Sequence, residues 1–224
     1  FIYNLDKYIS RGQTIYHIIA KTYKDFYDNI TIMFALQILG LCLLGMASVV
    51  VETTPTTVSV LDPAKYSGLW YQMYADKIVY DTFEKDSYCD TAKYTLQSNG
   101  DISVHNYAKV GSPNGTDYVI DGYAYNTDPN EPGKLKVHFD SENAAPFDAP
   151  YWVLMLGPIN VENQYDWSIV SDNVSRFLFV LARDTKTFYE KYNETVYDTA
   201  IDLGFTGRKQ PIATYQGENC MYEN

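Results

Sequence analysis

A regular succession of short segments rich in Tyr, Val, Ile, Phe and Thr dominates the chain beyond Ser67. Clusters of turn-forming residues separate these segments at intervals of about ten residues, a spacing typical of all-β domains. The clearest clusters are at 98–101, 111–115, 128–133 and 171–173. Their Gly, Pro, Asn and Asp residues reverse a chain by tolerating positive φ or by fixing φ at a turn value. The pattern predicts an antiparallel up-and-down sheet.

The number of segments is enough to close such a sheet into a barrel, which removes its free edges. Eight strands are expected near 69–76, 91–97, 101–109, 117–126, 133–140, 150–156, 165–171 and 176–183. A helix is predicted from Thr187 to Leu203, where apolar residues recur three or four positions apart, and Gly204 ends it. The predicted fold class is therefore all-β, an eight-stranded antiparallel up-and-down barrel with one C-terminal α-helix packed outside.

The N-terminal part of the chain does not follow this pattern. From Met33 an apolar run leads to the small residues Gly45 and Ala47, the arrangement of a cleavable secretory signal peptide. An uncleaved membrane anchor is the alternative, because the apolar run from Ile32 to Val51 is about as long as a bilayer-spanning helix. Both alternatives deliver the following residues to the lumenal side.

These features divide the chain into four parts and predict a secreted, extracellular protein. The parts are an upstream segment of doubtful translation at 1–32, a signal peptide at 33–47, a linker at 48–60 and a folded domain at 61–224. The whole chain carries a net charge of −11, which repels phosphate backbones and excludes nucleic acid as a partner.

Two cysteines follow the signal segment, and a third, Cys42, lies within it. In an oxidising compartment an even number of cysteines favours a disulfide, here between Cys89 and Cys220, and two unrelated buried thiols are the alternative. Glycosylation sequons begin at Asn114, Asn173 and Asn193. The first two are expected in turns and the third on the helix surface.

Three short motifs resemble the signatures of the lipocalin family. Gly68-Leu69-Trp70 resembles its G-x-W motif, Tyr165-Asp166-Trp167 its second motif, and Arg183 the arginine that ends its last barrel strand. Gly68, Trp70, Asp166 and Arg183 are therefore interpreted as structural signature residues. The resemblance implies that Trp70 closes the barrel floor and that the Arg183 guanidinium stacks on its indole and binds nearby backbone. Within the family, the sequence is most similar to the branch of apolipoprotein D, Lazarillo and bacterial outer-membrane lipocalins.

The resemblance also implies a set of residues around a ligand cavity. Carried over position by position, it gives Tyr66, Tyr94, Asn106, Phe139, Tyr151, Met155 and Phe179, and strand alternation adds Val104 and Val153. Aromatic packing that simply fills the barrel is the alternative for this set. Residues 75–88 are expected to form a mobile lid over the open end.

This set of residues predicts a secreted protein that binds or transports a small hydrophobic ligand such as a fatty acid, sterol, retinoid or bilin. No Ser/His/Asp order and no metal-spaced cluster is visible, so neither an enzyme, a cofactor nor a metal is expected. His105 and His138 alternate with inward positions and should face outward, which argues against haem ligation. The alternative function is an interaction protein whose open-end loops contact a receptor, a protease or a membrane surface. The sequence leaves the oligomeric state open.

Overall fold

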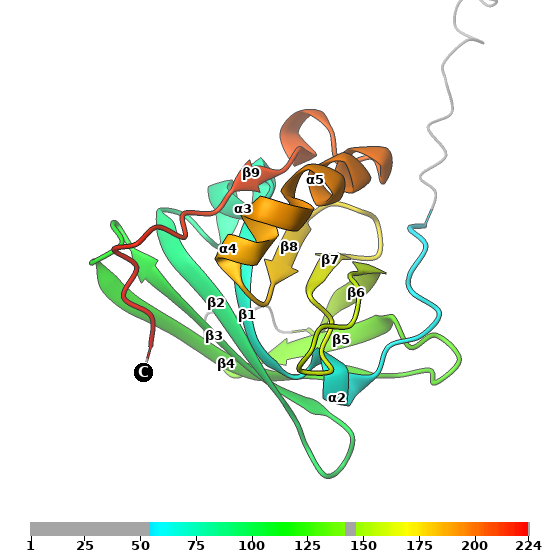
Figure 1. The fold of residues 1–224 in the computed structure, drawn as a ribbon. Helices are drawn as coiled ribbons and strands as arrows, with labels where there is room; N and C mark the ends of the chain where they lie inside the picture. The colour runs from blue at the N-terminus through cyan, green and yellow to red at the C-terminus, as the bar shows by residue number, and fades with distance from the viewer. Residues whose placement is uncertain (1–53, 142–146, 224) are drawn as a thin grey trace, which may run out of the picture. The chain divides into compact units, whose positions relative to one another are not determined.

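The computed structural model describes residues 54–141 and 147–223, most of which form a closed antiparallel sheet. The strands are β1 (Gly68–Ala75), β2 (Ser87–Leu96), β3 (Ile102–Val110), β4 (Thr116–Asn126), β5 (Lys134–Phe139), β6 (Ala149–Leu156), β7 (Trp167–Ser171), β8 (Leu178–Ala182) and β9 (Ile212–Ala213). Consecutive strands from β2 to β8 are neighbours, and β1 pairs with both β8 and β2, which closes the barrel (Figure 1). The predicted eight-stranded up-and-down barrel is confirmed, and β9 is an extra strand.

Strand β1 changes partner along its length. Its first half pairs with β2 as far as Tyr71 opposite Thr91, and its last residues pair with β9, where Ala75 lies opposite Ile212. The part of β2 that precedes Thr91 therefore has no ladder to β1. Its own pairing with β3 is irregular between Tyr88 and Thr91, and Cys89 there has a φ of 60°. The two strands separate towards one end of the barrel and leave a seam.

Side-chain alternation along β8 divides the apolar residues into two cores. Phe179 and Leu181 face the barrel interior, whereas Leu178 and Val180 face the opposite side. The second core lies between the barrel wall and a helical segment that begins directly after β8. Both faces of β8 are apolar because both are covered.

The helical segment comprises α4 (Thr185–Thr187), a π-helical turn η1 (Phe188–Tyr192) and α5 (Asn193–Asp202). The Asp184 carboxylate accepts a hydrogen bond from the backbone N–H of Thr187 and caps its start. Gly204, with a φ of 92°, ends it. The predicted C-terminal helix packed outside the barrel is thus confirmed, with a π-helical turn that the sequence pattern did not indicate (Figure 1).

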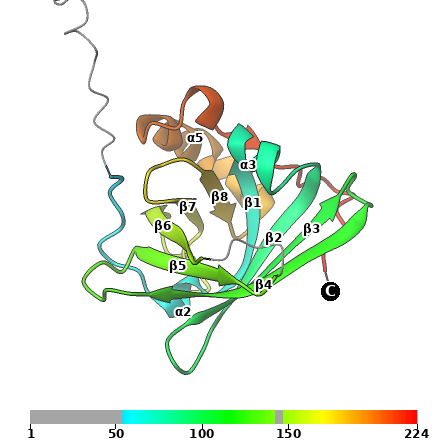
Figure 2. The same ribbon diagram turned by 180° about the vertical axis from the view of Figure 1, so that it is seen from behind.

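Two short helices lie at opposite ends of the barrel, and a single 3₁₀ turn, η2 (Gly207–Lys209), precedes β9 (Figures 1 and 2). Helix α2 (Pro63–Tyr66) lies at the end where β1 begins. Helix α3 (Lys77–Thr82) occupies the segment that was expected to be a mobile lid. The buried Asp76 carboxylate caps α3 by accepting a hydrogen bond from the Val79 N–H. This segment is therefore a capped helix followed by a short loop.

The predictions for residues 1–32 and 33–47, and for residues 48–53 of the 48–60 linker, lie outside the described residues. Within the part that is described, no helix has the length and apolar content needed to span a bilayer.

Candidate functional site

The barrel is plugged at the α2 end by Trp70. This side chain is fully buried, and its indole N–H donates to the Tyr66 carbonyl at 2.8 Å. The Arg183 guanidinium carbon lies 3.5 Å from the centroid of the indole ring. Gly68 makes room for this contact, because its φ is +107° and an added Cβ would lie 3.1 Å from the guanidinium. The glycine, the tryptophan and the arginine form one packed unit.

The N–H groups of Arg183 donate hydrogen bonds to main-chain carbonyl groups of the surrounding segments. The accepting carbonyl groups belong to Tyr165, Leu69, Lys65, Tyr66 and Ser67. Burial lowers the pKa of Arg183 to about 10, so the side chain stays charged at neutral pH. Asp166 is also engaged: its carboxylate accepts from the Tyr192 hydroxyl at 2.6 Å and connects this end of the barrel to the outer helix. These contacts leave Arg183 no role in the barrel cavity.

A cavity lies inside the barrel, next to this plug, and its empty space of about 320 Å³ includes solvent at its open side. It is lined by Tyr66, Tyr94, Ile102, Val104, Asn106, Ala124, Leu135, Val137, Phe139 and Tyr151. Apolar walls with a few polar groups are usual for small-molecule sites.

Six of the nine predicted cavity residues line this space: Tyr66, Tyr94, Val104, Asn106, Phe139 and Tyr151. Val153 is fully buried in the same inner core without reaching the cavity. Phe179 belongs to that core as well, with its ring 6.1 Å from that of Phe83 in the segment after α3. The structure therefore brings eight of the nine residues to the interior.

Met155 is the exception, and the prediction for it is wrong. The β6–β7 ladder is irregular between Val153 and Met155, so that Met155 lies opposite Ile169 of the outer core. The bulge reverses the alternation: Leu154 and Met155 both face away from the cavity, and Leu156 returns to the inner core. Met155 is accordingly 37% exposed.

Four cavity residues were missing from the predicted set: Ile102, Ala124, Leu135 and Val137. Alternation within β5 places Leu135 and Val137 on the same face as Phe139, so that signal was present in the sequence. Ala124 could not be identified from alternation, because the inward face of β4 also carries Gly122, whereas the outward face carries Val119, Tyr123 and Tyr125. The two faces therefore differ little in apolar character.

A chain of hydroxyl groups lies at the plugged end of the cavity. The Tyr66 hydroxyl is 2.8 Å from that of Tyr151 and 3.1 Å from Ser168 Oγ, and the Tyr94 hydroxyl is 3.2 Å from that of Tyr151. Burial raises the pKa of Tyr66 to about 12 and also raises the pKa of Tyr94 and Tyr151. All three phenols are therefore neutral. On the cavity wall, the buried Oδ1 of Asn106 has no hydrogen-bond partner.

The two histidines considered in the sequence lie on the outer surface. His105 contacts the carboxylates of Asp121 and Glu223, and His138 Nδ1 is 2.8 Å from Asp148. No group of three His, Cys, Asp or Glu side chains with metal-binding geometry occurs within residues 54–141 and 147–223.

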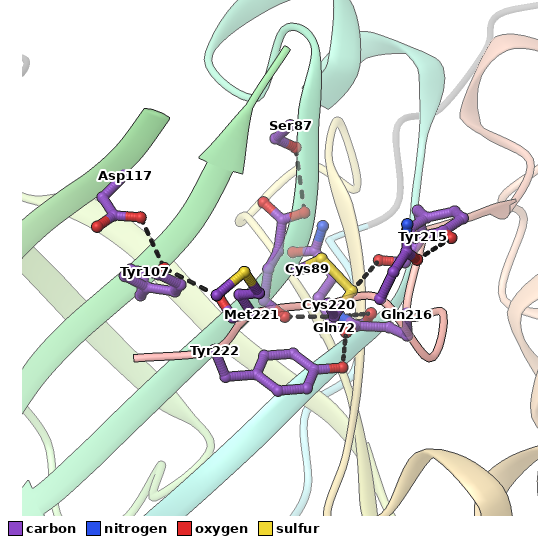
Figure 3. Close-up of a disulfide and its surroundings, with 12 residues drawn as sticks. Gln72, Ser87, Cys89, Tyr107, Asp117, Tyr215, Gln216, Cys220, Met221 and Tyr222 are labelled. Carbon is purple, nitrogen blue, oxygen red and sulfur yellow. Dashed lines mark hydrogen bonds between the residues drawn. A yellow bond between two sulfur atoms is a disulfide. The ribbon is translucent and has the colours of Figure 1, made fainter. Parts of the chain in front are cut away.

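The seam between β1 and β2 is covered by the C-terminal segment, shown in Figure 3. The predicted disulfide is confirmed: Cys89 of β2 is bonded to Cys220 across a sequence separation of 131. The side-chain amide of Gln216 donates to the carbonyl of Gln72 on β1 and to that of Asp90 on β2. One glutamine thus joins the two strands where their own ladder has ended.

Two acidic side chains, the half-buried Glu84 and the buried Asp90, lie behind this segment. Glu84 accepts a hydrogen bond from Gln72 Nε2 at 2.7 Å, and Asp90 accepts one from Ser87. Burial, and next the nearby Asp90 carboxylate, raise the pKa of Glu84 to about 8, and burial raises the pKa of Asp90 to about 6. At neutral pH the folded chain therefore favours a proton on this pair.

The acidic pair predicts a fold that weakens as the pH rises. Because the folded-state pKa of Glu84 is above the unfolded value of about 4.3, its stabilising effect is complete below that value and is lost as the pH rises through about 8. Wild-type protein should melt at a lower temperature at pH 9 than at pH 5, and Glu84→Gln should reduce that difference by several degrees. Thermal unfolding followed by circular dichroism measures it. The exposed Glu218→Gln is the matched control, and an equal effect of the two substitutions would contradict the assignment.

The glycosylation sequons occupy different surroundings. Asn114 and Asn173 are exposed in the loops before β4 and after β7. Asn193 is half-buried at the start of α5, and its Oδ1 accepts a hydrogen bond of 2.5 Å from the Tyr74 hydroxyl. The first two side chains are therefore free to carry a glycan.

Comparison with known proteins gives consistent matches. The family described as "Lipocalin-like domain" matches residues 61–210. The chain is 39% identical to apolipoprotein D of Rattus norvegicus over 101 residues, which cover 45% of this chain and 49% of that protein. It is 36% identical to apolipoprotein D of Macaca fascicularis over 133 residues, covering 59% and 66%. The chain thus spans about half to two thirds of the length of these curated relatives.

Solved structures resemble the barrel at lower sequence identity. Insecticyanin from the tobacco hornworm Manduca sexta superposes with a TM-score of 0.56 at 17% identity, over 76% of this chain and 89% of that one. Japanin from Rhipicephalus appendiculatus, solved bound to cholesterol, gives a TM-score of 0.51 at 16% identity, over 72% and 100%. These similarities concern the fold alone. Because the family match covers well over half of the sequence and coincides with the closed barrel, the chain belongs to the lipocalin family.

Proposed function

We propose that this protein is a secreted carrier that holds a small hydrophobic molecule in its barrel cavity. The observation that carries the proposal is the cavity itself, which is walled by apolar side chains and has three phenols and one amide as its polar groups. Each methylene group that a ligand buries there gains about 0.8 kcal/mol. The relatives support the proposal, since japanin was solved with cholesterol bound.

The contact residues proposed for this ligand are the cavity-lining members of the predicted set. Tyr66, Tyr94 and Tyr151 give polar contacts at the plugged end, Asn106 gives one on the wall, and Val104 and Phe139 give apolar contacts. Val153 and Phe179 are proposed to support the wall from the inner core. No catalytic step is proposed for these groups.

We further propose that residues 33–47 direct the chain to the secretory pathway, with 61–224 as the mature folded domain. The Cys89–Cys220 disulfide favours an oxidising compartment. Glycans are proposed on Asn114 and Asn173, which are exposed, and not on Asn193.

Filling the cavity should abolish binding. Ala124 lines the cavity and is 5% exposed, so Ala124→Phe occupies the space that the ligand needs. We expect protein secreted from its own source to carry a co-purified lipid or pigment in native mass spectrometry, and the variant to carry none. In titrations with retinol or a fatty alcohol followed by tryptophan fluorescence, affinity should fall about 100-fold.

Val119→Phe is the matched control on the same strand. Val119 alternates to the outer face and is 41% exposed, so the added ring leaves the cavity unchanged. Consistent absence of any bound or quenching ligand in wild-type protein would sink the carrier proposal. Circular dichroism spectra of both variants check that the barrel is intact.

The second candidate function is contact with a receptor or membrane surface through the open-end loops. It is favoured by exposed apolar side chains there: Phe83 after α3, Phe147 before β6 and Val174 between β7 and β8 are 52%, 66% and 37% exposed. The two functions are separable, because Ala124→Phe would leave a loop-mediated interaction with vesicles intact.

A further inference from the structure

The polar groups of the cavity are few and uncharged. Of its ten lining residues, Tyr66, Tyr94, Tyr151 and Asn106 have polar side chains, and none carries a charge. The cation in the plug is Arg183, whose N–H groups are bound to five backbone carbonyls and whose face covers Trp70. Among the described residues that line the cavity, none offers an anionic ligand a cation to pair with.

One hydroxyl proton of the chain is not used in the hydrogen bonds within it. Ser168, Tyr66, Tyr151 and Tyr94 are joined in that order by three hydrogen bonds, and each hydroxyl has a single proton. Three protons are used within the chain, so the fourth is available to an acceptor outside it. When all the bonds point from Ser168 towards Tyr94, that proton belongs to Tyr94, which lines the cavity. In that arrangement the chain presents one donor to a ligand.

The amide of Asn106 complements this donor. Its buried Oδ1 has no partner, and leaving a buried acceptor unpaired lowers stability. An amide has an acceptor at one terminal atom and donors at the other. A ligand hydroxyl, which both donates and accepts, pairs with either, whereas a carboxylate pairs only with the donors and leaves the oxygen unmatched.

Burying an isolated carboxylate is far more costly than burying a hydroxyl group. The tyrosines of the cavity show the same preference for uncharged groups, because burial raises the pKa of Tyr66 and Tyr94 and so favours their neutral form. The net charge of −11 adds long-range repulsion of anions. We propose that the cavity selects an uncharged apolar molecule that carries one hydroxyl group, or a comparable donor–acceptor group, and rejects the matching carboxylate. This inference rests on the proposed carrier function.

A set of ligands with the same chain length tests the selectivity. Decan-1-ol, decanamide, decanoate and decane differ only at one end, and calorimetric titration at neutral pH gives their affinities for the wild-type protein. Decan-1-ol and decanamide should bind at least about tenfold more tightly than decanoate. Decan-1-ol should also bind more tightly than decane, because decane leaves Asn106 and the hydroxyl chain unpaired.

Two substitutions at Asn106 locate the effect. Asn106→Lys supplies the missing cation and should reverse the preference, so that decanoate binds more tightly than decan-1-ol. Asn106→Leu removes the amide and should abolish the advantage of decan-1-ol over decane, which keeps the test decisive if the lysine variant does not fold. Ser103→Lys and Ser103→Leu, on the outward face of the same strand, are the matched controls and should change neither ratio.

The outcomes separate this inference from the carrier function. If decanoate binds the wild-type protein as tightly as decan-1-ol, and Ala124→Phe abolishes both, the selectivity is overturned and the carrier function stands. If none of the four compounds, and no lipid or pigment from the native source, binds the wild-type protein, both proposals fail.

Discussion

Replacing Arg183 with lysine is expected to lower the free energy of unfolding by about 3 kcal/mol, although the charge is kept. The guanidinium reaches five carbonyl oxygens on two separate segments of chain and lies flat on Trp70, 3.5 Å from its ring centroid. A lysine ammonium group has three donors and no planar face, so it leaves carbonyl groups unpaired and loses the stacking contact. Urea unfolding followed by tryptophan fluorescence measures the change.

Arg176→Lys is the matched control for this substitution. Arg176 is exposed, and its guanidinium lies 5.7 Å from the centroid of the Phe177 ring. Exchange at such a site should change stability by less than about 0.5 kcal/mol. If Arg183→Lys were as mild as Arg176→Lys, the plug would be stabilised by packing around Trp70 and not by the arginine.

Removing the disulfide is expected to have a comparable or larger effect. The bond joins residues separated by 131 positions, and the chain-entropy model gives about 5 kcal/mol for a loop of this size, with typical measured losses of about 2–5 kcal/mol. The double variant Cys89→Ala/Cys220→Ala should therefore unfold at much lower urea concentration. Because Cys89 is fully buried, part of the loss comes from the small cavity that the substitution leaves.

Reduction of the wild-type protein separates these two contributions, since it breaks the bond and keeps both side chains. The reduced protein should be less stable than the oxidised protein and more stable than the double alanine variant. Intact mass before and after alkylation should reveal no free thiol at Cys89 or Cys220 in the secreted form. Two alkylated thiols there, or equal stability of reduced and oxidised protein, would contradict the prediction.

Side-chain alternation was enough to locate most of the interior from the sequence. In β5 and β8 it separates the cavity side from the outer side correctly, because neither strand contains a bulge. It fails at Met155, because the bulge in β6 follows from how that strand fits the curvature of the closed barrel, which a local pattern does not contain. Three short motifs around Trp70, Asp166 and Arg183 indicated the fold for a different reason. Their residues make the contacts that close the plugged end of the barrel.

The acidic pair behind the C-terminal segment could not be predicted. Glu84 lies in a stretch of Asp, Glu, Lys and Tyr that is typical of an exposed loop, and nothing nearby in sequence indicates its partial burial. Its hydrogen-bond partner Gln72 and the nearby Asp90 come from other elements, and Gln72 also donates to Thr214, which lies 130 positions beyond Glu84 in the chain. The role of Gln216 could not be predicted either, because its partners Gln72 and Asp90 lie 144 and 126 positions away in the sequence.

The position of Gln216 near the end of the chain also affects when the barrel wall can be completed during synthesis. A nascent chain that has emerged only as far as β8 can form all eight barrel strands, yet the far halves of β1 and β2 still lack the amide that joins them. Over the same interval Cys89 has no disulfide partner and can react with other thiols. Completion of the wall is thus a late event, and a ribosome stalled shortly before residue 216 would hold a barrel with an open side.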